Sequence, residues 1–481
     1  MEMKCLQCKV AEVDIQYQLI MGRQSHVLMV PFPAQGHISP LMKLANVIAD
    51  HGVKVTFVNT EIMHTSIMAA RANSKVHSQV TFVSVTDGLE PGDNRRDAIK
   101  FMRSLLKVLP GQLRNLIEKL NGLNEKLSYA VVDTTLGWLV EDIKKMGVKC
   151  AAFSPAGPSA LAAAYHIPKL IEDGIVDLNG TAQKGHESVS LSDGGPAFNT
   201  NEFPWTFPFD PETQKVIFEY ASSTVKAIDH SDHVLCNAFQ HLDSPTCGLI
   251  PNLLCIGPLL NTSQSGSSGG SIWQEDSTCL TWLDTQPTNS VIYVAFGSMA
   301  IFSQNQFDEI AIGLELTGRP FLWVVRPDLM NGAKVTYPDG FLERTSKRGK
   351  IVEWAPQDLV LAHGSISLFI SHCGWNSTIE ALTLGIPFLC WPYFSDQFQN
   401  KRYICDVWRV GLALDMDKNR IVSSMMVKGK VESLLSDLGI TANALKFKER
   451  AMASASPGGS SFGNLKSFIK KLKSENHVLS M

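Results

Sequence analysis

The sequence lacks any hydrophobic run of the roughly 18 to 20 consecutive apolar residues that a membrane-spanning helix requires. Residues 1–25 carry charged side chains and have no apolar core of the kind found in secretory signals. They read as a loose extension. From these two absences we expect no membrane insertion, no secretion and a cytoplasmic location.

A block of like charges is also missing. Lys and Arg total 43 and Asp and Glu total 46, which gives a formal net charge of -3 without clustering of either sign. Binding to a nucleic-acid backbone needs a concentrated basic face, so nucleic acid is excluded as an expected partner.

The cysteines form no recognisable ligand set. Ten are present, but only Cys5 and Cys8 lie close together, and no second pair completes a four-ligand zinc site. Reduced thiols and no bound metal are the expectation. They are consistent with a reducing compartment.

Several sequence motifs of other enzyme classes are absent or misplaced. No G-x-G-x-x-G follows the first predicted strand and no Walker A sequence occurs, which removes the main support for a dinucleotide oxidoreductase or an NTPase. The match to a hydrolase nucleophile elbow at 266–270 lies in a Ser/Gly-rich stretch rather than between a strand and a helix. Asp415 and Asp417 resemble a metal-binding carboxylate pair but are better explained as a solvated turn.

What is present is enough chain for two large domains. The 481 residues are 44% hydrophobic and 19% charged, a composition typical of folded globular proteins. From His26 onward, short apolar runs alternate with longer amphipathic ones, which predicts parallel sheets covered by helices. The predicted strands of the first half are 26–32, 53–59, 80–85, 129–133 and 149–154.

The second half repeats this pattern, with predicted strands at 290–297, 320–325, 350–355, 367–372 and 386–391. We therefore predict an α/β protein with two Rossmann-like, doubly wound domains that face each other across a cleft. The expected segments are an N-terminal extension, a first domain, a flexible Ser/Gly-rich linker, a second domain and a last amphipathic helix that docks back on the first domain, at residues 1–25, 26–260, 261–275, 276–455 and 456–481.

The segment 354–397 carries side chains suited to a nucleotide. Trp354 ends a predicted strand, and a flat indole beside Gln357 suits stacking on a base and a hydrogen bond to a ribose hydroxyl. A tryptophan at this position can equally cap the core. Glu380 can accept hydrogen bonds from ribose hydroxyls, or be an ordinary charge near a helix start.

A strand-to-helix break at Gly374 adds a place for phosphate. The free amides at the helix start, together with His372, Asn376 and Ser377, form a predicted pyrophosphate site. After the next strand, the adjacent pair Asp396-Gln397 offers acceptors and donors for the vicinal hydroxyls of a sugar.

The first half supplies a candidate base. His37 follows the first predicted strand in a Gly-bearing loop, where a neutral imidazole can take a proton from a hydroxyl. Asp133 ends the fourth predicted strand at the same sheet edge. If the two side chains meet, Asp133 would orient the imidazole and stabilise its protonated form.

These residues resemble a known family. The segment from Trp354 through HCGWNS to the closing Asp-Gln is similar to the signature box of plant family-1 UDP-glycosyltransferases, and the resemblance extends from Pro31 to the terminal helix. It implies a GT-B type fold and transfer of a sugar from a UDP-sugar, with no metal and no cofactor.

The resemblance also implies roles for matching positions. Trp354 would stack on uracil, with backbone contacts from Ala355, and Gln357 and Glu380 would hold the ribose. The phosphates would be bound by His372, Asn376 and Ser377, near Gly374, with a further contact from Ser298; the sugar would be bound by Trp375, Asp396 and Gln397. A glutamine at the end of the box favours UDP-glucose.

The mechanism implied is one inverting displacement, in which His37 deprotonates an acceptor hydroxyl and UDP leaves, so an α-linked donor gives a β-glucoside. Apolar residues of the first half, including Trp138, Phe153 and Phe207, suggest a pocket for a lipophilic aglycone such as a flavonoid, phenylpropanoid or terpenoid.

Two alternatives remain open at the level of sequence. A sugar-nucleotide epimerase on the same architecture would turn over UDP-sugar without an acceptor, and a non-catalytic sugar-nucleotide binding protein would need neither His37 nor Asp133. The expected state is a monomer whose partners are a sugar donor and a hydroxylated small molecule.

Overall fold

The structure, a computed structural model, describes residues 24–70, 79–123, 125–185, 187–191, 197–207, 210–259, 271–330 and 333–478. Most of the predicted N-terminal extension and residues 261–270 of the predicted linker lie outside these ranges. We call residues 24–259 the N-lobe, 271–275 the crossing segment and 276–455 the C-lobe.

The N-lobe is built on a seven-stranded sheet in the order β3-β2-β1-β4-β5-β8-β9, in which every pairing is parallel. The side chains of its central strands are nearly all buried, as expected for a sheet covered on both faces, whereas its two edge strands are partly exposed. The strands of this sheet are β1 (His26–Val30), β2 (Lys54–Thr60), β3 (Val80–Val85), β4 (Tyr129–Asp133), β5 (Lys149–Ser154), β8 (His233–Cys236) and β9 (Leu253–Cys255).

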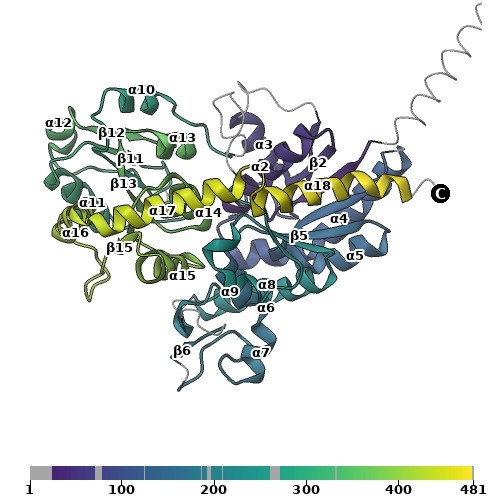
Figure 1. Ribbon diagram of the computed structural model, residues 1–481. Helices are drawn as coiled ribbons and strands as arrows, with labels where there is room; N and C mark the ends of the chain where they lie inside the picture. The colour runs from purple at the N-terminus through teal and green to yellow at the C-terminus, as the bar shows by residue number, and fades with distance from the viewer. Residues whose placement is uncertain are drawn as a thin grey trace, which may run out of the picture.

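Helices connect these strands and cover both faces of the sheet (Figure 1). Asp97 caps α4 by accepting from the backbone N–H of Lys100, and Asp210 caps α8 in the same way. The N-lobe helices are α2 (Gln35–Asp50), α3 (Glu61–Ala70), α4 (Ala98–Gly122), η1 (Thr134–Leu139), α5 (Val140–Lys145), α6 (Pro158–Tyr165), α7 (Ile167–Glu172), η2 (Thr200–Glu202), α8 (Pro211–His230), η3 (Gln240–Leu242) and α9 (Ser244–Cys247).

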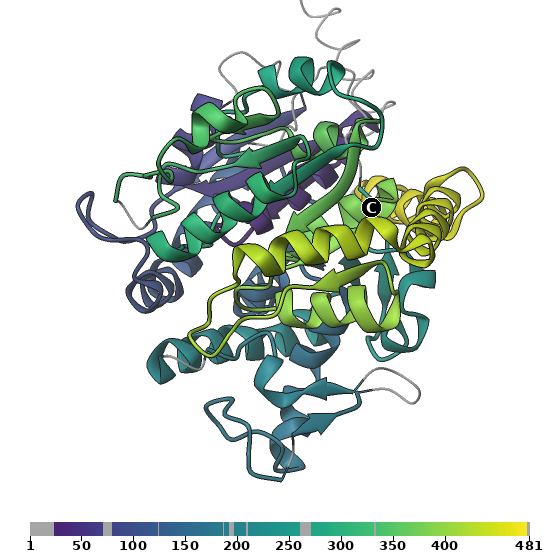
Figure 2. The same ribbon diagram turned by 90° about the vertical axis from the view of Figure 1, so that its left-hand side faces the viewer.

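A two-stranded antiparallel ribbon, β6 (Ser188–Val189) and β7 (Phe198–Asn199), projects from the N-lobe together with α7, as both ribbon views show (Figure 2).

The C-lobe contains a six-stranded parallel sheet in the order β12-β11-β10-β13-β14-β15. Its strands are β10 (Val291–Ala295), β11 (Phe321–Val324), β12 (Gly349–Val352), β13 (Ile366–Ser371), β14 (Phe388–Cys390) and β15 (Gly411–Ala413). Its helices are α10 (Thr278–Asp284), α11 (Gln304–Leu316), α12 (Phe341–Thr345), α13 (Gln357–Ala362), α14 (Trp375–Leu384), α15 (Gln397–Arg402), η4 (Tyr403–Val407), α16 (Ser424–Ser436) and α17 (Leu438–Ala455).

The two doubly wound sheets confirm the predicted fold class. Each sheet reverses its strand order beside its first strand, between β1 and β4 in the N-lobe and between β10 and β13 in the C-lobe. In open parallel sheets, ligands bind outside the carboxyl ends of the strands at such a switch point. The loops after β1, β4, β10 and β13 are therefore the natural places for functional side chains.

The lobes meet through a shared apolar core. One cluster of buried side chains contains Phe203, Trp205 and Phe239 of the N-lobe together with Trp375 and Trp408 of the C-lobe. Polar contacts also cross the interface: the indole N–H of Trp408 donates to the carbonyl oxygen of Leu242 over 3.2 Å, and the Tyr403 hydroxyl donates to Asp243 over 2.6 Å. The lobes are thus in extensive contact in this structure.

The chain returns to the N-lobe at its end. Helices α17 and α18 (Ser460–Val478) run one after the other across both lobes (Figure 1). Phe468, Ile469 and Leu472 of α18 are buried in the core that lies against one face of the N-lobe sheet, and the Phe468 ring meets the Tyr129 ring edge-on at a centroid distance of 5.8 Å.

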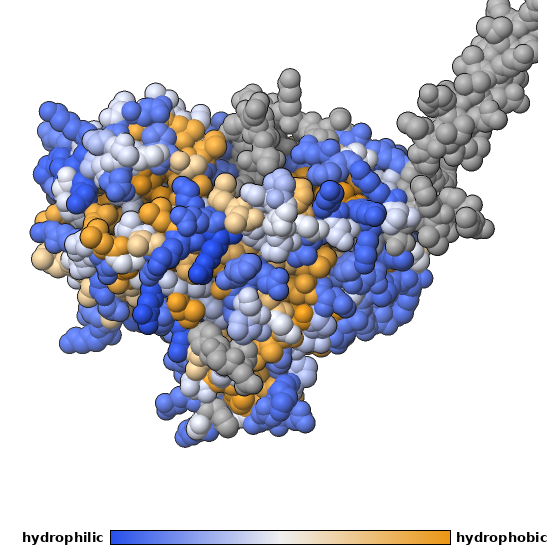
Figure 3. Space-filling model, in the orientation of Figure 1, coloured by the Kyte–Doolittle hydropathy of each residue, from blue (hydrophilic) through white to orange (hydrophobic). Residues whose placement is uncertain are grey.

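The surface on the α17 and α18 side is mostly hydrophilic at the outer edges of the lobes, and its hydrophobic patches are separate from one another (Figure 3). Within the described residues, no helix combines the length and the apolar character needed to cross a membrane.

Candidate active site

The predicted base and its partner are in contact. His37 lies in the first turn of α2, just after the loop that follows β1, and its Nδ1 is 2.7 Å from Oδ2 of Asp133. Because a carboxylate only accepts, Nδ1 carries the proton and Nε2 keeps the lone pair of a base. The His37 side chain is 26% exposed, whereas that of Asp133 is fully buried. The ring can therefore be reached by a substrate while its orienting group cannot.

Asp133 is fixed by backbone groups. It ends β4, the neighbour of β1 at the switch point, and caps η1 by accepting from the N–H of Thr135 over 2.9 Å. Its other oxygen also accepts from the N–H of Phe32 over 3.3 Å. The carboxylate is thus held from three sides, which limits the rotation of the imidazole.

Trp354 lies just after β12 and is half-buried. One face of its indole stacks on Trp273 of the crossing segment, with ring centroids 5.6 Å apart and planes inclined by 22°. The carbonyl of Trp354 accepts from the N–H of Asp276 over 2.9 Å, and Ala355 beside it is buried. These contacts fix the indole plane that is predicted to stack on a base.

The crossing segment differs from the expected flexible linker. Ser271 is buried, and the N–H of Ile272 donates to the side-chain oxygen of Gln35 at the start of α2 over 2.9 Å. Since Trp273 packs on the C-lobe, residues 271–275 contact both lobes and are a packed part of the interface.

Three residues of the predicted ribose and phosphate set form one network. The side-chain amide of Gln357 donates to the Ser377 hydroxyl over 2.7 Å and to Oε2 of Glu380 over 2.8 Å. Oε1 of Glu380 accepts from the ammonium group of Lys43, on α2 of the N-lobe, over 2.7 Å. The structure therefore brings Gln357, Ser377 and Glu380 together.

Helix α14 begins directly after the end of β13. Cys373 has a φ of 65°, in the left-handed region, and Gly374 is the N-terminal cap residue, so the first amide groups of the helix are left without partners inside the helix. The side-chain amide of Asn376 donates to the carbonyl of Gly36 in α2 over 2.7 Å. The amides at this helix start thus lie at the junction of the two lobes.

His372 lies between two glycines that follow β10 and β13. A Cβ atom added to Gly297 or to Gly374 would come within 2.5 Å of the His372 Nε2. Burial lowers the pKa of His372 to about 4, against a weaker upward effect of the Ala295 carbonyl. The imidazole is therefore neutral at physiological pH, and any contact it makes to phosphate is a hydrogen bond rather than an ion pair.

Ser298 follows Gly297, and its carbonyl accepts from the guanidinium of the buried Arg326. The same guanidinium donates to the carbonyl of Ala300 and lies 3.2 Å from a carboxylate oxygen of Asp328. Arg326 thus shapes the loop after β10, a role that the sequence analysis missed. A lone Arg after a strand gave no signal, because its partners are backbone atoms.

Trp375 is placed differently from the expectation. Its indole is buried, and the indole N–H donates to the carbonyl of Asn237 in the N-lobe over 3.0 Å. A Cβ atom on Gly157 would lie 2.6 Å from the Trp375 ring. The side chain therefore fills the lobe interface.

Asp396 and Gln397 lie at the start of α15, after the left-handed Ser395 with a φ of 58°. Gln397 is buried, and its side-chain oxygen accepts from the N–H groups of Tyr393 and Phe394 over 2.7 and 3.0 Å. Its oxygen is thus committed to the loop, and its amide nitrogen remains as the group that can donate to a ligand.

Burial raises the pKa of Asp396 to about 6, against smaller downward effects of a hydrogen bond from Asn400 and of His37 across the interface. A free aspartate titrates near 3.9. A raised carboxyl pKa means that protonated Asp396 is favoured in the folded state. Proton binding by Asp396 therefore stabilises the fold below pH 4, and this stabilisation is lost as the pH rises through about 6.

Asp396→Asn should therefore increase the free energy of unfolding at pH 7.5 by about 1 to 2 kcal/mol, less than the full two-unit shift implies because the side chain is partly exposed. At pH 4 the difference should vanish. Urea unfolding at both pH values measures it, with Asp339→Asn, at an exposed aspartate, as the control. A gain of equal size at both pH values would contradict the assignment.

The expected acceptor residues are scattered. Phe153 is fully buried in the N-lobe core, so the expectation that it contacts an acceptor disagrees with the structure. Trp138 is half-buried against the other core of this lobe. Phe207 is half-buried, and its N–H donates to the side-chain oxygen of Gln214. None of the three residues lines the hollow described next.

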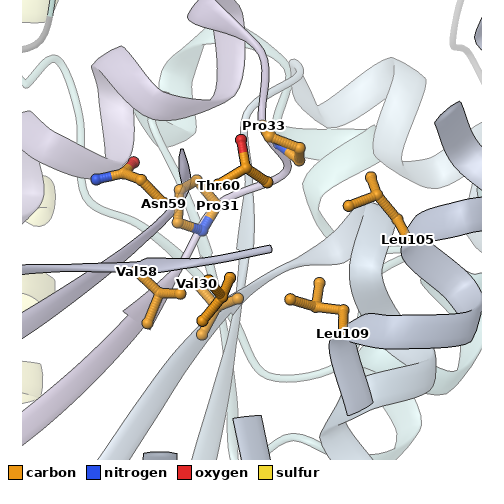
Figure 4. A pocket seen from close by; sticks show the side chains of 9 residues that line it. Val30, Pro31, Pro33, Val58, Asn59, Thr60, Leu105 and Leu109 are labelled. Atoms are coloured by element: carbon orange, nitrogen blue, oxygen red, sulfur yellow. The ribbon is translucent and has the colours of Figure 1, made fainter. Parts of the chain in front are cut away.

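A hollow does lie beside the loop between β1 and α2. It is shallow, because most of the roughly 270 Å3 of empty space counted there is open solvent. Leu105 and Leu109 of α4 face Val30 and Val58 across it (Figure 4). The remaining lining residues come from the same loop and from the ends of β2 and β3: Pro31, Pro33, Asn59, Thr60 and Val85. Its lining is mainly apolar.

No group of three or more metal-ligating side chains is found in the described parts of the chain. The eight cysteines of those parts are all free thiols.

Two family models match the chain. The model described as UDP-glucoronosyl and UDP-glucosyl transferase matches residues 232–450, and the model described as glycosyltransferase, N-terminal domain, matches residues 24–154. UDP-glycosyltransferase 83A1 of Arabidopsis thaliana is 40% identical over 95% of this chain and 98% of its own. A 7-deoxyloganetin glucosyltransferase of Gardenia jasminoides is 30% identical over 94% of this chain and 98% of its own.

Solved structures agree with these matches. The crystal structure of Os79 from O. sativa in complex with UDP has a TM-score of 0.78 and 25% identity, and the match covers 93% of this chain and 100% of that chain. Two facing doubly wound lobes with this strand-end constellation define a GT-B glycosyltransferase.

More particularly, the chain belongs to the plant family-1 UDP-glycosyltransferases, as the sequence motifs indicated. It is a UDP-glycosyltransferase of plant small molecules, and neither the epimerase alternative nor the binding-protein alternative retains support.

Proposed function

We propose that the protein transfers glucose from UDP-glucose to a hydroxyl of a lipophilic small molecule and forms a β-glucoside. The observation that carries the proposal is the 2.7 Å contact between His37 and Asp133 at the edge of the lobe interface. It supplies an oriented imidazole next to the segment that resembles a UDP-sugar box. The name of the Gardenia relative, a glucosyltransferase, supports glucose as the sugar.

In the proposed reaction, Nε2 of His37 takes the proton of the acceptor hydroxyl while that oxygen attacks the anomeric carbon. The bond between this carbon and the phosphate oxygen breaks, and UDP leaves with the electron pair. A single displacement inverts the anomeric configuration. Asp133 stabilises the imidazolium that forms.

The leaving diphosphate would be bound by the amides at the start of α14, by Ser377 and by the neutral His372. Trp354 would stack on the uracil, and Gln357 and Glu380 would hold the ribose. Asp396 lies close enough for His37 to affect its pKa, which supports a sugar-binding role beside the base.

The acceptor would bind near the loop between β1 and α2, beside this small hollow. Its lining by Val30, Leu105 and Leu109 supports an apolar aglycone bound chiefly by contact area. Flavonoids, phenylpropanoids and terpenoids with a free hydroxyl share this character.

The direct test is incubation with UDP-glucose and a panel of hydroxylated aglycones, with UDP release and product mass as readouts. We expect UDP release to depend on an acceptor and the product to be heavier by one hexose. Release at the same rate without any acceptor would refute transfer to these compounds. UDP-galactose as a second donor tests the choice of sugar.

Gln397→Glu tests the contact with the sugar. The glutamate oxygen can still accept from the N–H groups of Tyr393 and Phe394, but the N–H donor is lost. We expect kcat/KM for UDP-glucose to fall about tenfold, the value of one strong hydrogen bond, while the Kd for UDP stays within about twofold.

Steady-state kinetics and calorimetric titration with UDP give the two values for this variant. The exposed Gln183, changed to Glu, serves as the matched control. An equal loss of UDP affinity would show that Gln397 acts on the nucleotide side and not on the sugar.

A further inference from the structure

A buried cation from the N-lobe enters the nucleotide side of the C-lobe. Lys43 belongs to α2, six positions after His37, and its side chain is only 5% exposed. Its ammonium group is 2.7 Å from Oε1 of Glu380 and 3.9 Å from a carboxylate oxygen of Asp358. This ion pair joins residues that lie 337 positions apart in the sequence and on different lobes.

Lys43 remains charged in this setting. Burial alone would lower the pKa of Lys43, but the carboxylates of Glu380 and Asp358 outweigh burial and raise it overall. A buried ion pair is seldom more stabilising than apolar side chains of the same volume. Stability alone is therefore a weak explanation for this one.

The pair controls the geometry of Glu380. Oε2 of this carboxylate accepts from Gln357 over 2.8 Å, and Gln357 is itself anchored to Ser377 over 2.7 Å. One oxygen is thus held from within the C-lobe and the other from the N-lobe. Each carboxylate oxygen has a second lone pair, so both can still accept from a diol.

We propose that Lys43 is a positioning residue for donor recognition, which orients Glu380 from the opposite lobe to accept hydrogen bonds from the ribose hydroxyls. The inference rests on the proposed ribose-binding role of Glu380. Because Lys43 and His37 share α2, the same rigid helix that carries the base also completes the nucleotide site.

This arrangement links the position of the catalytic base to the binding of the nucleotide. The N–H of Ile272 contacts Gln35, and Asn376 contacts Gly36, both at the start of α2. Displacement of α2 would therefore remove the base from the sugar and the counter-charge from Glu380 together. Full affinity for the ribose requires the lobes in the contact seen here.

The test compares binding of UDP with binding of 2′-deoxy-UDP, which lacks one of the hydroxyls that Glu380 would accept from. In the unaltered protein we expect UDP to bind about tenfold more tightly, the effect of one charge-assisted hydrogen bond. Lys43→Met keeps the aliphatic stem and removes the ammonium. It should weaken UDP about tenfold, weaken 2′-deoxy-UDP much less, and so reduce the ratio of the two Kd values to within about twofold of one.

Three further variants separate the possible outcomes. Lys43→Arg retains the charge and should retain most of the ratio. Lys54→Met is the matched control, since Lys54 also forms a 2.7 Å ion pair, with Glu125, on the far side of the N-lobe. It should leave both Kd values unchanged. If Lys43→Met does not fold, Lys43→Gln replaces it with the same expected loss of the ratio.

Glu380→Gln distinguishes failure of this inference from failure of the proposed function. If Glu380→Gln leaves the ratio intact, Glu380 does not bind the ribose. If Glu380→Gln abolishes the ratio but Lys43→Met weakens both nucleotides equally, or tightens UDP, the positioning role of Lys43 is refuted. An equal loss on both nucleotides would indicate a purely structural ion pair.

Discussion

His37→Ala is expected to reduce kcat by at least about a thousandfold and to leave the Kd for UDP within about twofold. General-base catalysis by a positioned histidine contributes about a hundredfold to ten-thousandfold. The 26% exposed imidazole contacts Asp133 and lies at the interface, but no residue of the proposed UDP site depends on it for a hydrogen bond among the described contacts. Product formation and calorimetric titration with UDP measure the two effects separately.

Two further variants sharpen this experiment. Asp133→Asn keeps the size of the side chain but offers an amide to Nδ1, so it disturbs the tautomer and should lower kcat about a hundredfold or more. His51→Ala removes an exposed histidine at the other end of α2, and its kinetics should match those of the unaltered protein. Substantial turnover by His37→Ala would mean that another group takes the proton.

Gly297→Ala is expected to weaken UDP binding by about tenfold to a hundredfold. Gly297 has a φ of 68°, and an L-residue in the left-handed region costs about 1 to 2 kcal/mol. In addition, the new Cβ would lie 2.5 Å from Nε2 of His372, so the ring or the loop after β10 must move. Both groups belong to the proposed phosphate site.

Two other glycines distinguish the effect of backbone strain at Gly297 from the effect of the steric clash with His372. Gly374→Ala creates the same 2.5 Å contact with His372 but at a φ of -60°, so it should weaken UDP less than Gly297→Ala. Gly364→Ala, in the turn before β13, meets no atom within 4 Å and should have no effect. Unchanged UDP affinity in Gly297→Ala would exclude the loop after β10 from the nucleotide site.

The sequence predicted the parts of the fold that local patterns determine. Each strand expected from an apolar run is present close to its predicted bounds, because buried parallel strands are continuous hydrophobic segments. The short strands β8, β9 and β15 were not predicted, since runs of three or four residues carry little periodic signal. The stretch between β4 and β5 forms two successive short helices, η1 and α5.

Within the site, prediction succeeded for residues of suitable chemistry that lie near the carboxyl ends of neighbouring strands. His37 follows β1 and Asp133 ends the adjacent strand β4, so their contact could be anticipated from the strand order of doubly wound sheets. Lys43, Trp273 and the packing of Trp375 against Gly157 could not. They depend on how the two lobes fit together, and no local spacing reports on such contacts.

The residues near the acceptor also could not be predicted from local sequence patterns. Phe153 was expected near a ligand because it is aromatic and close to a strand end, yet it points into the core. The alternation of side chains along a strand does not reveal which strand ends remain accessible to a ligand. That depends on the lengths of the helices that cover the sheet. Leu105 and Leu109 line the hollow only because α4 passes over the ends of β1 and β2.

The course of the chain limits how the lobes can separate. It passes between them twice, once at residues 271–275, which contact both lobes, and once where α17 gives way to α18, whose Phe468 is buried against the N-lobe. Two covalent crossings suppress sliding and leave pivoting about the line through them as the easiest movement. In any rotation about that axis, α2 would move as one piece with the N-lobe that carries it.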